Sequence, residues 1–409
     1  MCFAAGRAAR RPAAQVPLPQ TDGCTLAAPL TTLTDLPAFA TASVDGWAVR
    51  GVPPWRVVGQ ALAGGVPPAL TEDGTAMQIA TGAMVPAGAT SVLRIEESSR
   101  DTDGRVSGAP RPQPEWRVPG EEATVGEELL PAGTPVDPGV IGLAASCGYD
   151  SLPVHRQIRA ALLVFGDELL TAGRPGAGRV RDALGPAVPA WLHRYGCELS
   201  PPAVTGPIAD TLDAHVDGLR TALADADLVC TTGGTMHGPV DHLHPALREL
   251  GAEYVVNTVA VRPGFPMLLA RVGASDGRQR FVAGLPGNPQ SAIVALVSLV
   301  APLVAGLQGR QAPTLPRHRL GAPVPGRGDF THLALVRTDP LTGTAHPVPY
   351  TGSAMLRGLA AAAGFAVIPP GATGVPGDEV CVVPLPLLPG ERPSAQLCGQ
   401  PQRPAREPR

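Results

Sequence analysis

Residues 159–309 alternate between short apolar runs and longer segments with helical periodicity, and this alternation limits the possible folds more than any other feature of the chain. Alternation of this kind builds a doubly wound, mostly parallel sheet with helices on both faces. Ligands of such a sheet bind at the carboxyl ends of its strands. The predicted strands lie at 160–165, 228–231 and 281–285, and the predicted helices at 183–195, 208–224, 244–251 and 290–307.

The loop after the second predicted strand is rich in glycine and ends in a carboxylate. It contains Thr232, Gly233, Gly234 and Asp241. Glycine lets a backbone approach a ligand closely. A helix that follows the glycines would direct free N–H groups at an anion, and Asp241 could hold a metal ion beside that anion. An ordinary strand-to-helix loop is the alternative interpretation of the same residues.

Two further loops are expected at the same edge of the sheet, and both carry carboxylates. They span residues 166–168, which include Glu168, and residues 179–182. A single carboxylate on a solvated loop usually has no function. Acidic groups on three loops around a glycine-rich turn favour a phosphate group held together with Mg²⁺.

Length and composition describe a protein of several domains with no general affinity for nucleic acid. A chain of 409 residues is too long for one core, and a formal net charge of −3 does not attract it to nucleic acid or anionic lipid. The seven cysteines are scattered without a C-x-x-C pair, which favours a reducing cytoplasm. The longest apolar run, 292–307, contains Pro302 and is short for a bilayer, so a soluble protein without a membrane span is predicted.

The regions that flank the strand–helix alternation are rich in short strands and Pro/Gly turns. They predict a β-rich architecture on both sides of the α/β domain. The predicted divisions are a disordered arm at 1–16, an N-terminal extended domain at 17–54 and 130–157, a small β-rich domain at 55–129, the α/β domain at 158–312, a C-terminal β domain at 313–389 and a disordered tail at 390–409.

Four motifs in a fixed order resemble one known family. Residues 43–49, Ser-Val-Asp-Gly-Trp-Ala-Val, are similar to its Ser-Ala-Met-Asp-Gly-Tyr-Ala, and residues 80–97 to its Thr-Gly-Ala-x-x-Pro-x-Gly-Ala segment. Residues 232–241 resemble its Ser-Gly-Gly-Val-Ser-x-Gly-x-x-Asp loop, and residues 284–291, Gly-Leu-Pro-Gly-Asn-Pro-Gln-Ser, reproduce its Gly-Leu-Pro-Gly-Asn-Pro-Val-Ser. The family is the molybdopterin molybdenumtransferases, the molybdenum-insertion enzymes of molybdenum cofactor synthesis, which are related to the C-terminal part of gephyrin. The resemblance runs from about residue 17 to 388.

The resemblance implies a transferase that inserts molybdate into adenylylated molybdopterin and releases AMP with the help of Mg²⁺. It also implies an elongated homodimer, whose active site is shared between the α/β domain of one subunit and the N-terminal region of the other. A molybdopterin-adenylating protein and molybdoenzymes are the partners that such a reaction implies. Interaction with nucleic acid or a membrane is not implied.

The family's functional residues transfer to matching positions of this sequence. The catalytic positions are Asp45, Glu168 and Arg262, and the metal positions are Glu168 and Asp241. The positions expected to bind the cofactor precursor are Thr81, Arg117, Thr232, Gly233, Gly234, Pro263, Gly264, Pro266, Pro286, Gly287, Asn288, Pro289 and Ser291.

Some of these residues have an ordinary structural interpretation as well. Asp45 begins an Asp-Gly turn, which is common. Thr81 alone would more often be a helix cap, and Arg117 a surface charge. Pro286 and Pro289 are expected to shape the turn around Gly287 and Asn288 rather than to take part in chemistry.

The sequence also departs from the family pattern. The family's Lys-Pro-Gly-Lys-Pro, whose lysines are expected to face the oxyanion, reads Arg262-Pro-Gly-Phe265-Pro266, and the chain contains no lysine at all. Arg262 keeps a cation with a bidentate fork, whereas Phe265 keeps none. The other departures are His332 for an arginine, Pro207-Ile208 for paired aspartates, Leu184 for an asparagine and Phe165 for a threonine.

These departures leave a second function open. A paralogue that binds molybdopterin or the finished cofactor, for delivery or storage and with little or no catalysis, would keep the glycine turn and lose cations at the oxyanion site. A third possibility, an interaction scaffold as gephyrin is in part, has no partner groove marked in the sequence.

Overall fold

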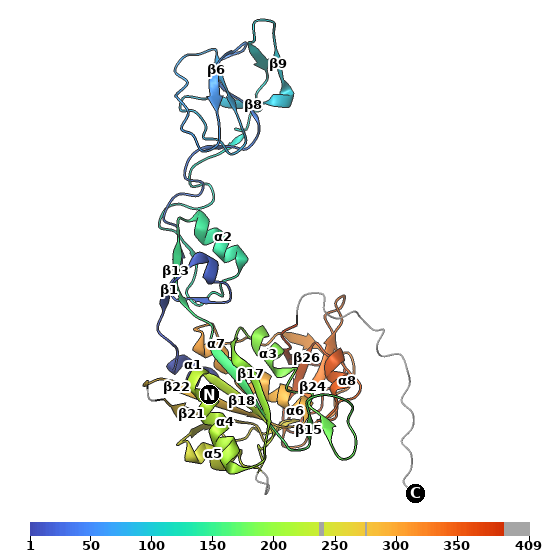
Figure 1. The fold of residues 1–409 in the computed structure, drawn as a ribbon. Helices are drawn as coiled ribbons and strands as arrows, with labels where there is room; N and C mark the ends of the chain where they lie inside the picture. Colours follow the sequence, from blue (N-terminus) through green and yellow to red (C-terminus); the bar gives the residue numbers. More distant parts are fainter. Residues whose placement is uncertain (237–240, 275, 388–409) are drawn as a thin grey trace. The chain divides into compact units, whose positions relative to one another are not determined.

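The computed structural model describes residues 1–236, 241–274 and 276–387, which form two compact units (Figure 1). The first unit contains residues 1–13, residues 23–25 and the chain from residue 155 onward; the second contains residues 14–22 and 26–154. The predicted tail at 390–409 lies outside the described residues.

A mixed six-stranded sheet organises the first unit, with the strand order β17-β14-β18-β22-β21-β19. The first four strands of this order run parallel, and β21 and β19 complete the sheet in antiparallel pairs. The prediction of a doubly wound, mostly parallel sheet is therefore confirmed. The strands span Arg159–Phe165 (β14), Glu198–Ile208 (β17), Leu228–Thr232 (β18), Glu253–Val256 (β19), Leu268–Gly273 (β21) and Gln279–Leu285 (β22).

Helices cover both faces of this sheet because successive strand residues point to opposite sides. Leu162 belongs to a core cluster that includes residues of α3 (Val188–Arg194) and of the helix beginning at Pro289. Leu163 belongs to the opposite cluster, with residues of α4 (Leu212–Asp225) and α5 (Leu243–Glu249). The strands are buried on both sides, and this accounts for their nearly continuous apolar sequence.

Two predicted helices begin later than the sequence indicated. The helix predicted at 183–195 starts at Val188, because the Asp182 side chain accepts hydrogen bonds from the N–H groups of Leu184 and Gly185 and closes a turn there. The helix predicted at 208–224 starts at Leu212. β17 continues to Ile208, and the Thr211 side chain then caps α4.

One long apolar helix runs through the core of the first unit. It consists of α6 (Pro289–Ala295), a π-helical turn (Leu296–Val300) and α7 (Ala301–Leu307). By length and composition this helix could cross a membrane, contrary to the prediction from residues 292–307 alone, because it begins at Pro289. In its most apolar 18-residue segment, 83% is buried inside the protein, so it is a core helix.

The N-terminal arm is not disordered as predicted. Residues Cys2–Ala8 form helix α1, which packs on α7. The backbones approach so closely that a Cβ atom on Gly6 would lie 2.3 Å from the Leu303 carbonyl oxygen, and one on Gly306 would lie 2.4 Å from that of Phe3. Both positions therefore require glycine, and the contact brings together residues that are remote in sequence.

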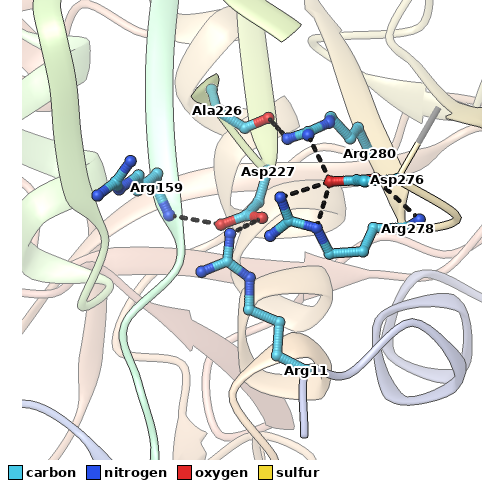
Figure 2. A network of polar contacts seen from close by, with 7 residues as sticks. All are labelled: Arg11, Arg159, Ala226, Asp227, Asp276, Arg278 and Arg280. Carbon is cyan, nitrogen blue, oxygen red and sulfur yellow. Dashed lines mark hydrogen bonds and ion pairs between the residues drawn. The ribbon is translucent and has the colours of Figure 1, made fainter. Parts of the chain in front are cut away.

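A polar network continues this attachment at the start of β18 (Figure 2). The Arg11 guanidinium pairs with the buried Asp227 carboxylate, whose second oxygen accepts a hydrogen bond of 2.8 Å from the Arg159 N–H group. Nearby, Arg280 contacts the Asp276 carboxylate at 3.0 Å. Arg11 thus stabilises a carboxylate that would otherwise be buried without a counter-charge.

A C-terminal sheet completes the first unit. Its order is β20-β24-β26-β27-β23, and β25 also pairs with β24. Strand β20 comes from the middle of the α/β segment, so the chain crosses into the C-terminal sheet and back. The elements are β20 (Val261–Arg262), β23 (Arg317–Arg319), β24 (Thr331–Thr338), β25 (Ala345–Pro347), α8 (Leu356–Ala361), β26 (Gly364–Ile368) and β27 (Glu379–Pro384).

The second unit contains a four-stranded sheet with the order β6-β7-β5-β8. Its strands are β5 (Gly46–Arg50), β6 (Arg56–Ala61), β7 (Thr75–Ile79) and β8 (Ser91–Arg94). The domain boundary predicted between residues 54 and 55 cuts through this sheet, because β5 is an inner strand that pairs with both β7 and β8.

Short paired strands and one helix make up the rest of the second unit. Strand β1, which falls partly within the arm predicted to be disordered, pairs with β13. The elements are β1 (Ala14–Pro17), β2 (Thr25–Leu26), β3 (Leu30–Thr31), β4 (Thr41–Ala42), β9 (Ser98–Arg100), β10 (Val106–Gly108), β11 (Trp116–Arg117), β12 (Glu128–Leu130), α2 (Pro138–Ser146) and β13 (Ser151–His155).

Candidate functional site

A cavity of about 560 Å³ opens at the carboxyl ends of β14, β18 and β22, in the size range of small-molecule sites. We call it the cradle pocket. It brings together Glu168 from the first predicted loop and Thr232 and Gly233 from the glycine turn. Its wall also contains Phe165, Asp182, Leu184, Gly287, Asn288 and Pro289.

The glycine turn has a backbone that only glycine adopts without strain. Gly233 and Gly234 have φ angles of +89° and +66°. A Cβ atom on Gly233 would also lie 3.3 Å from the Phe165 carbonyl oxygen. The Gly233 N–H group donates to the Leu285 carbonyl at 3.0 Å, so it holds β18 to β22 and is not available to a ligand.

The helix at this edge differs from the one that the sequence predicted. The helix after the glycine turn, α5, begins only at Leu243. Residues 237–240, which complete the predicted motif before Asp241, lie outside the described residues. The helix whose start lies in the cradle pocket is the long core helix, which begins at Pro289 after Asn288.

A second cavity of about 930 Å³ adjoins the first, since Asn288 lines both. We call it the β20 pocket. Predicted residues that line it are Arg262, Pro263, Gly264, Pro266, Pro286, Asn288 and Ser291, and they are joined by Phe265, Arg327, Phe330, His332, Thr351 and Ser353. The two pockets therefore contain most of the positions expected to bind the cofactor precursor.

Arg262 and His332 both line the β20 pocket. The two residues are register partners in the parallel pair of β20 and β24. The guanidinium carbon of Arg262 lies 4.5 Å from the ring centre of Phe330 and 5.4 Å from that of Phe265. The two rings meet edge to face, with centres 5.7 Å apart and planes at 85°. Phe265 brings no charge, yet it forms part of an aromatic support for Arg262.

His332 provides no positive charge at neutral pH. Its ring is buried, and this burial lowers the pKa of His332; the hydrogen bond to Pro325 opposes this shift, and the charge of Arg327 adds to it. The Nδ1 atom lies 2.7 Å from the Pro325 carbonyl oxygen and must donate the hydrogen there. The neutral ring then leaves Nε2 as an acceptor, so Arg262 and Arg327 are the cations in the wall of this pocket.

Asp45 and Thr81 are joined directly in the second unit. One carboxylate oxygen of Asp45 accepts hydrogen bonds from the Thr81 N–H group at 2.6 Å and from its hydroxyl at 2.9 Å. These bonds lower the pKa of Asp45. Arg117 lies on β11, which pairs with β4, and the loop after Thr81 bonds to the other edge of β4. Thr81 is thus the partner of Asp45 and not a helix cap.

Comparison with known proteins places the chain in a family. Residues 4–148 match the MoeA N-terminal region (domain I and II), residues 161–306 a probable molybdopterin binding domain, and residues 317–385 the MoeA C-terminal region (domain IV). Molybdopterin molybdenumtransferase of Haemophilus influenzae is 31% identical over 294 residues, 69% of this chain and 70% of that protein. The enzyme of the same name from Staphylococcus aureus is 30% identical over 310 residues, with coverage of 73% and 72%.

The chain belongs to the molybdopterin molybdenumtransferase family. Two solved structures of the molybdopterin biosynthesis MoeA protein from Pyrococcus horikoshii share its fold, with TM-scores of 0.74 and 0.71 at 25% and 20% identity. They cover 94% and 93% of this chain and are each covered to 97%. The family's role lies in molybdenum cofactor biosynthesis, and molybdenum insertion is its function.

Sequence reasoning missed a carboxylate at the loop of residues 166–168. Glu168 follows Gly166, whose φ angle is +136° and where a Cβ atom would lie 2.8 Å from Glu168 Oε2. The turn is also held by Asp210, which accepts a hydrogen bond of 3.3 Å from the Asp167 N–H group. Strand β17 ends at Ile208, and Asp210 follows it in the chain.

A buried histidine lies behind the glycine turn and was also missed. The His215 ring stacks on Phe165 at 3.7 Å between ring centres. Its Nδ1 atom lies 2.8 Å from the Thr211 carbonyl oxygen, and its buried Nε2 atom has no partner among the described residues. Burial lowers the pKa of His215. A Cβ atom on Gly234 would lie 3.8 Å from Nε2, so the ring supports the inner side of the turn.

The described residues contain no group of three or more histidine, cysteine or carboxylate side chains arranged to hold a metal ion. Glu168 lines the cradle pocket, and Asp241 is half-buried directly after the residues that the structure does not describe. A metal at this edge would therefore take few ligands from this chain's own side chains.

Proposed function

We propose that this chain inserts molybdate into adenylylated molybdopterin and releases AMP, which yields the molybdenum cofactor. The observation that carries the proposal is the pair of adjoining pockets that share Asn288. One pocket has a glycine turn at the strand ends, where the phosphates of a ligand can approach the backbone. The other has guanidinium groups in its wall, suited to an oxyanion.

The cradle pocket would hold the phosphate end of the substrate. Asn288 lines it and can donate hydrogen bonds to phosphate oxygens, whereas the hydroxyl group of Thr232 is buried in the wall and has no partner among the described residues. The backbone at residues 234–236 would provide N–H donors, since the N–H group of Gly233 is used within the sheet. Molybdate would enter the β20 pocket, where Arg262 and Arg327 offer charge, and Thr351 and Ser353 offer hydroxyl groups.

Mg²⁺ would be held by Glu168 and Asp241 together with oxygens of the substrate. Both side chains are hard oxygen donors, and the small number of protein ligands suits an ion that keeps several waters and binds phosphate. When bound, the ion would neutralise charge that develops on the phosphates. The Glu168 carboxylate lies over Gly166, where an added Cβ atom would come within 2.8 Å of Oε2, and it lines the cradle pocket.

The second unit would contribute Asp45, with Thr81 and Arg117, from another copy of the chain in a homodimer. The support for this part is that the three candidate residues gather around one short strand, β4, and that Asp45 is kept ionised by Thr81.

The six cysteines in the described part of the chain are free thiols, which agrees with work in a reducing cytoplasm. A molybdopterin-adenylating protein would supply the substrate, and molybdoenzymes would receive the product.

AMP release tests the proposal. Purified protein is given adenylylated molybdopterin, Mg²⁺ and molybdate, and AMP is followed with and without molybdate. The proposal expects release that depends on molybdate. Tight binding of the adenylylated substrate without AMP release would instead identify a carrier or storage protein, a role that the lost lysine position and the neutral His332 would suit.

A further inference from the structure

The guanidinium group of Arg262 is supported by two aromatic rings. It lies 4.5 Å from the ring centre of Phe330 and 5.4 Å from that of Phe265, both within the range of cation–π attraction. Within the described part of the chain, no carboxylate pairs with Arg262. The rings, and not an acidic side chain, therefore hold this cation at the wall of the β20 pocket.

Local contacts hold the backbone that carries each ring. Phe265 follows Gly264, whose φ angle is +107° and where a Cβ atom would lie 2.9 Å from Met267 Cε and 3.1 Å from Val294 Cγ1, so the turn is packed against the core helix. Phe330 directly precedes β24, and its N–H group donates to the Arg327 carbonyl at 3.3 Å. Each ring is thus attached near one end of the β20–β24 pair.

An aromatic support changes what one arginine can do. A guanidinium stacked on a ring keeps its edge of N–H donors directed away from the ring, where they can form paired hydrogen bonds to an oxyanion. Holding the long side chain in one place reduces the conformational entropy that binding must otherwise remove. Apolar rings beside the charge also displace water, which strengthens its attraction for an anion.

We propose that Phe265 and Phe330 are positioning residues that hold Arg262 ready for a tetrahedral oxyanion dianion of the molybdate class. We call these two rings the aromatic clamp. Position 265 carries no charge in this chain, and the clamp offsets that loss by orienting the remaining cation, Arg262. The inference rests on the proposed function for the identity of the anion. The clamp itself rests on the geometry of the three side chains.

Molybdate binding to the full-length protein tests the clamp without any need for turnover. Calorimetry at fixed ionic strength compares the wild type with Phe265→Leu, which removes the ring, and with Phe265→Tyr, which keeps it. We expect Phe265→Leu to weaken molybdate binding by about three- to tenfold, the scale of one partly exposed cation–π contact. Phe265→Tyr should retain binding, and Phe330→Leu gives a second variant if Phe265→Leu unfolds.

A double-mutant cycle separates positioning from a general structural role. If the ring acts through Arg262, Phe265→Leu should cause no further loss in an Arg262→Gln background. An equal loss in both backgrounds, or wild-type binding by Phe265→Leu, would overturn the inference.

AMP release distinguishes failure of the clamp from failure of the proposed function. In an active protein, Phe265→Leu should raise the KM for molybdate and leave the KM for the adenylylated substrate unchanged; a rise in the second KM alone would count against the clamp. A wild type that binds molybdate but releases no AMP would refute the proposed function. The calorimetric double-mutant cycle would still show whether Phe265 acts through Arg262.

Discussion

One carboxylate oxygen of Asp45 receives two hydrogen bonds from Thr81, one from its N–H group at 2.6 Å and one from its hydroxyl at 2.9 Å. Two residues that the sequence selected from separate motifs thus form one structural pair. Because hydrogen bonds to the ionised form favour it, they lower the pKa of Asp45. Thr81 therefore keeps Asp45 charged and oriented.

Thr81→Val should raise the pKa of Asp45 toward its usual value of 3.8, because the hydroxyl donor is lost while the N–H donor stays. An NMR titration of the Asp45 carboxyl carbon measures this directly.

Asp45→Asn should reduce AMP release by about two orders of magnitude, the scale expected when a catalytic carboxylate is removed. Asp45 is exposed, so the fold should survive, and unchanged turnover would remove Asp45 from the mechanism.

Gly234→Ala should weaken binding of adenylylated molybdopterin, because its φ angle of +66° is strained for alanine and the turn would shift. Gly251→Ala is a matched control, since Gly251 has a φ angle of +64° with nothing within 4 Å of an added Cβ atom. Both variants should lose about 1–2 kcal/mol of stability in urea denaturation. Equal substrate affinity in the two variants would show that the glycine turn does not bind the ligand.

Much of this site could be predicted from the sequence because its signals are local. An apolar run ending in Thr232-Gly233-Gly234 specifies both a buried strand and the place where the strand ends. The position of Arg262 against Phe330 depends instead on the pairing of β20 with β24. These strands are remote in sequence, so no local sequence pattern predicts that they pair. The N-terminal helix was missed for the same reason, since Gly6 has its packing partner at Gly306.

Asp227→Ala should destabilise the protein by about 3–5 kcal/mol, because it leaves the partly buried Arg11 without its carboxylate and the Arg159 N–H group without an acceptor (Figure 2). Glu379→Ala is a suitable comparison, since Glu379 pairs with Arg317 at 3.1 Å on the surface. That exposed pair should contribute no more than about 1 kcal/mol. Denaturant midpoints measure both, and similar small losses would mean that the Arg11 network is not structurally important.

Stability should fall as the pH drops below about 6.5. Burial lowers the pKa of His155, His215 and His332 from the usual value of 6.5. Between that value and the lowered native pKa values, the unfolded chain binds more protons than the native protein, so protonation favours unfolding. Urea denaturation at pH 7.5, 6.5 and 5.5 should show this decrease, and His215→Phe should reduce it. A rise in stability over this range would contradict the assignment of neutral, buried rings.

Anomalous X-ray diffraction from crystals of the chain with adenylylated molybdopterin and molybdate tests the central claim most directly. The account predicts the molybdenum signal in the β20 pocket beside Arg262, and the substrate's phosphates in the cradle pocket between Glu168 and the backbone at Gly234. A molybdenum peak elsewhere, or phosphates bound away from the carboxyl ends of β14, β18 and β22, would contradict it.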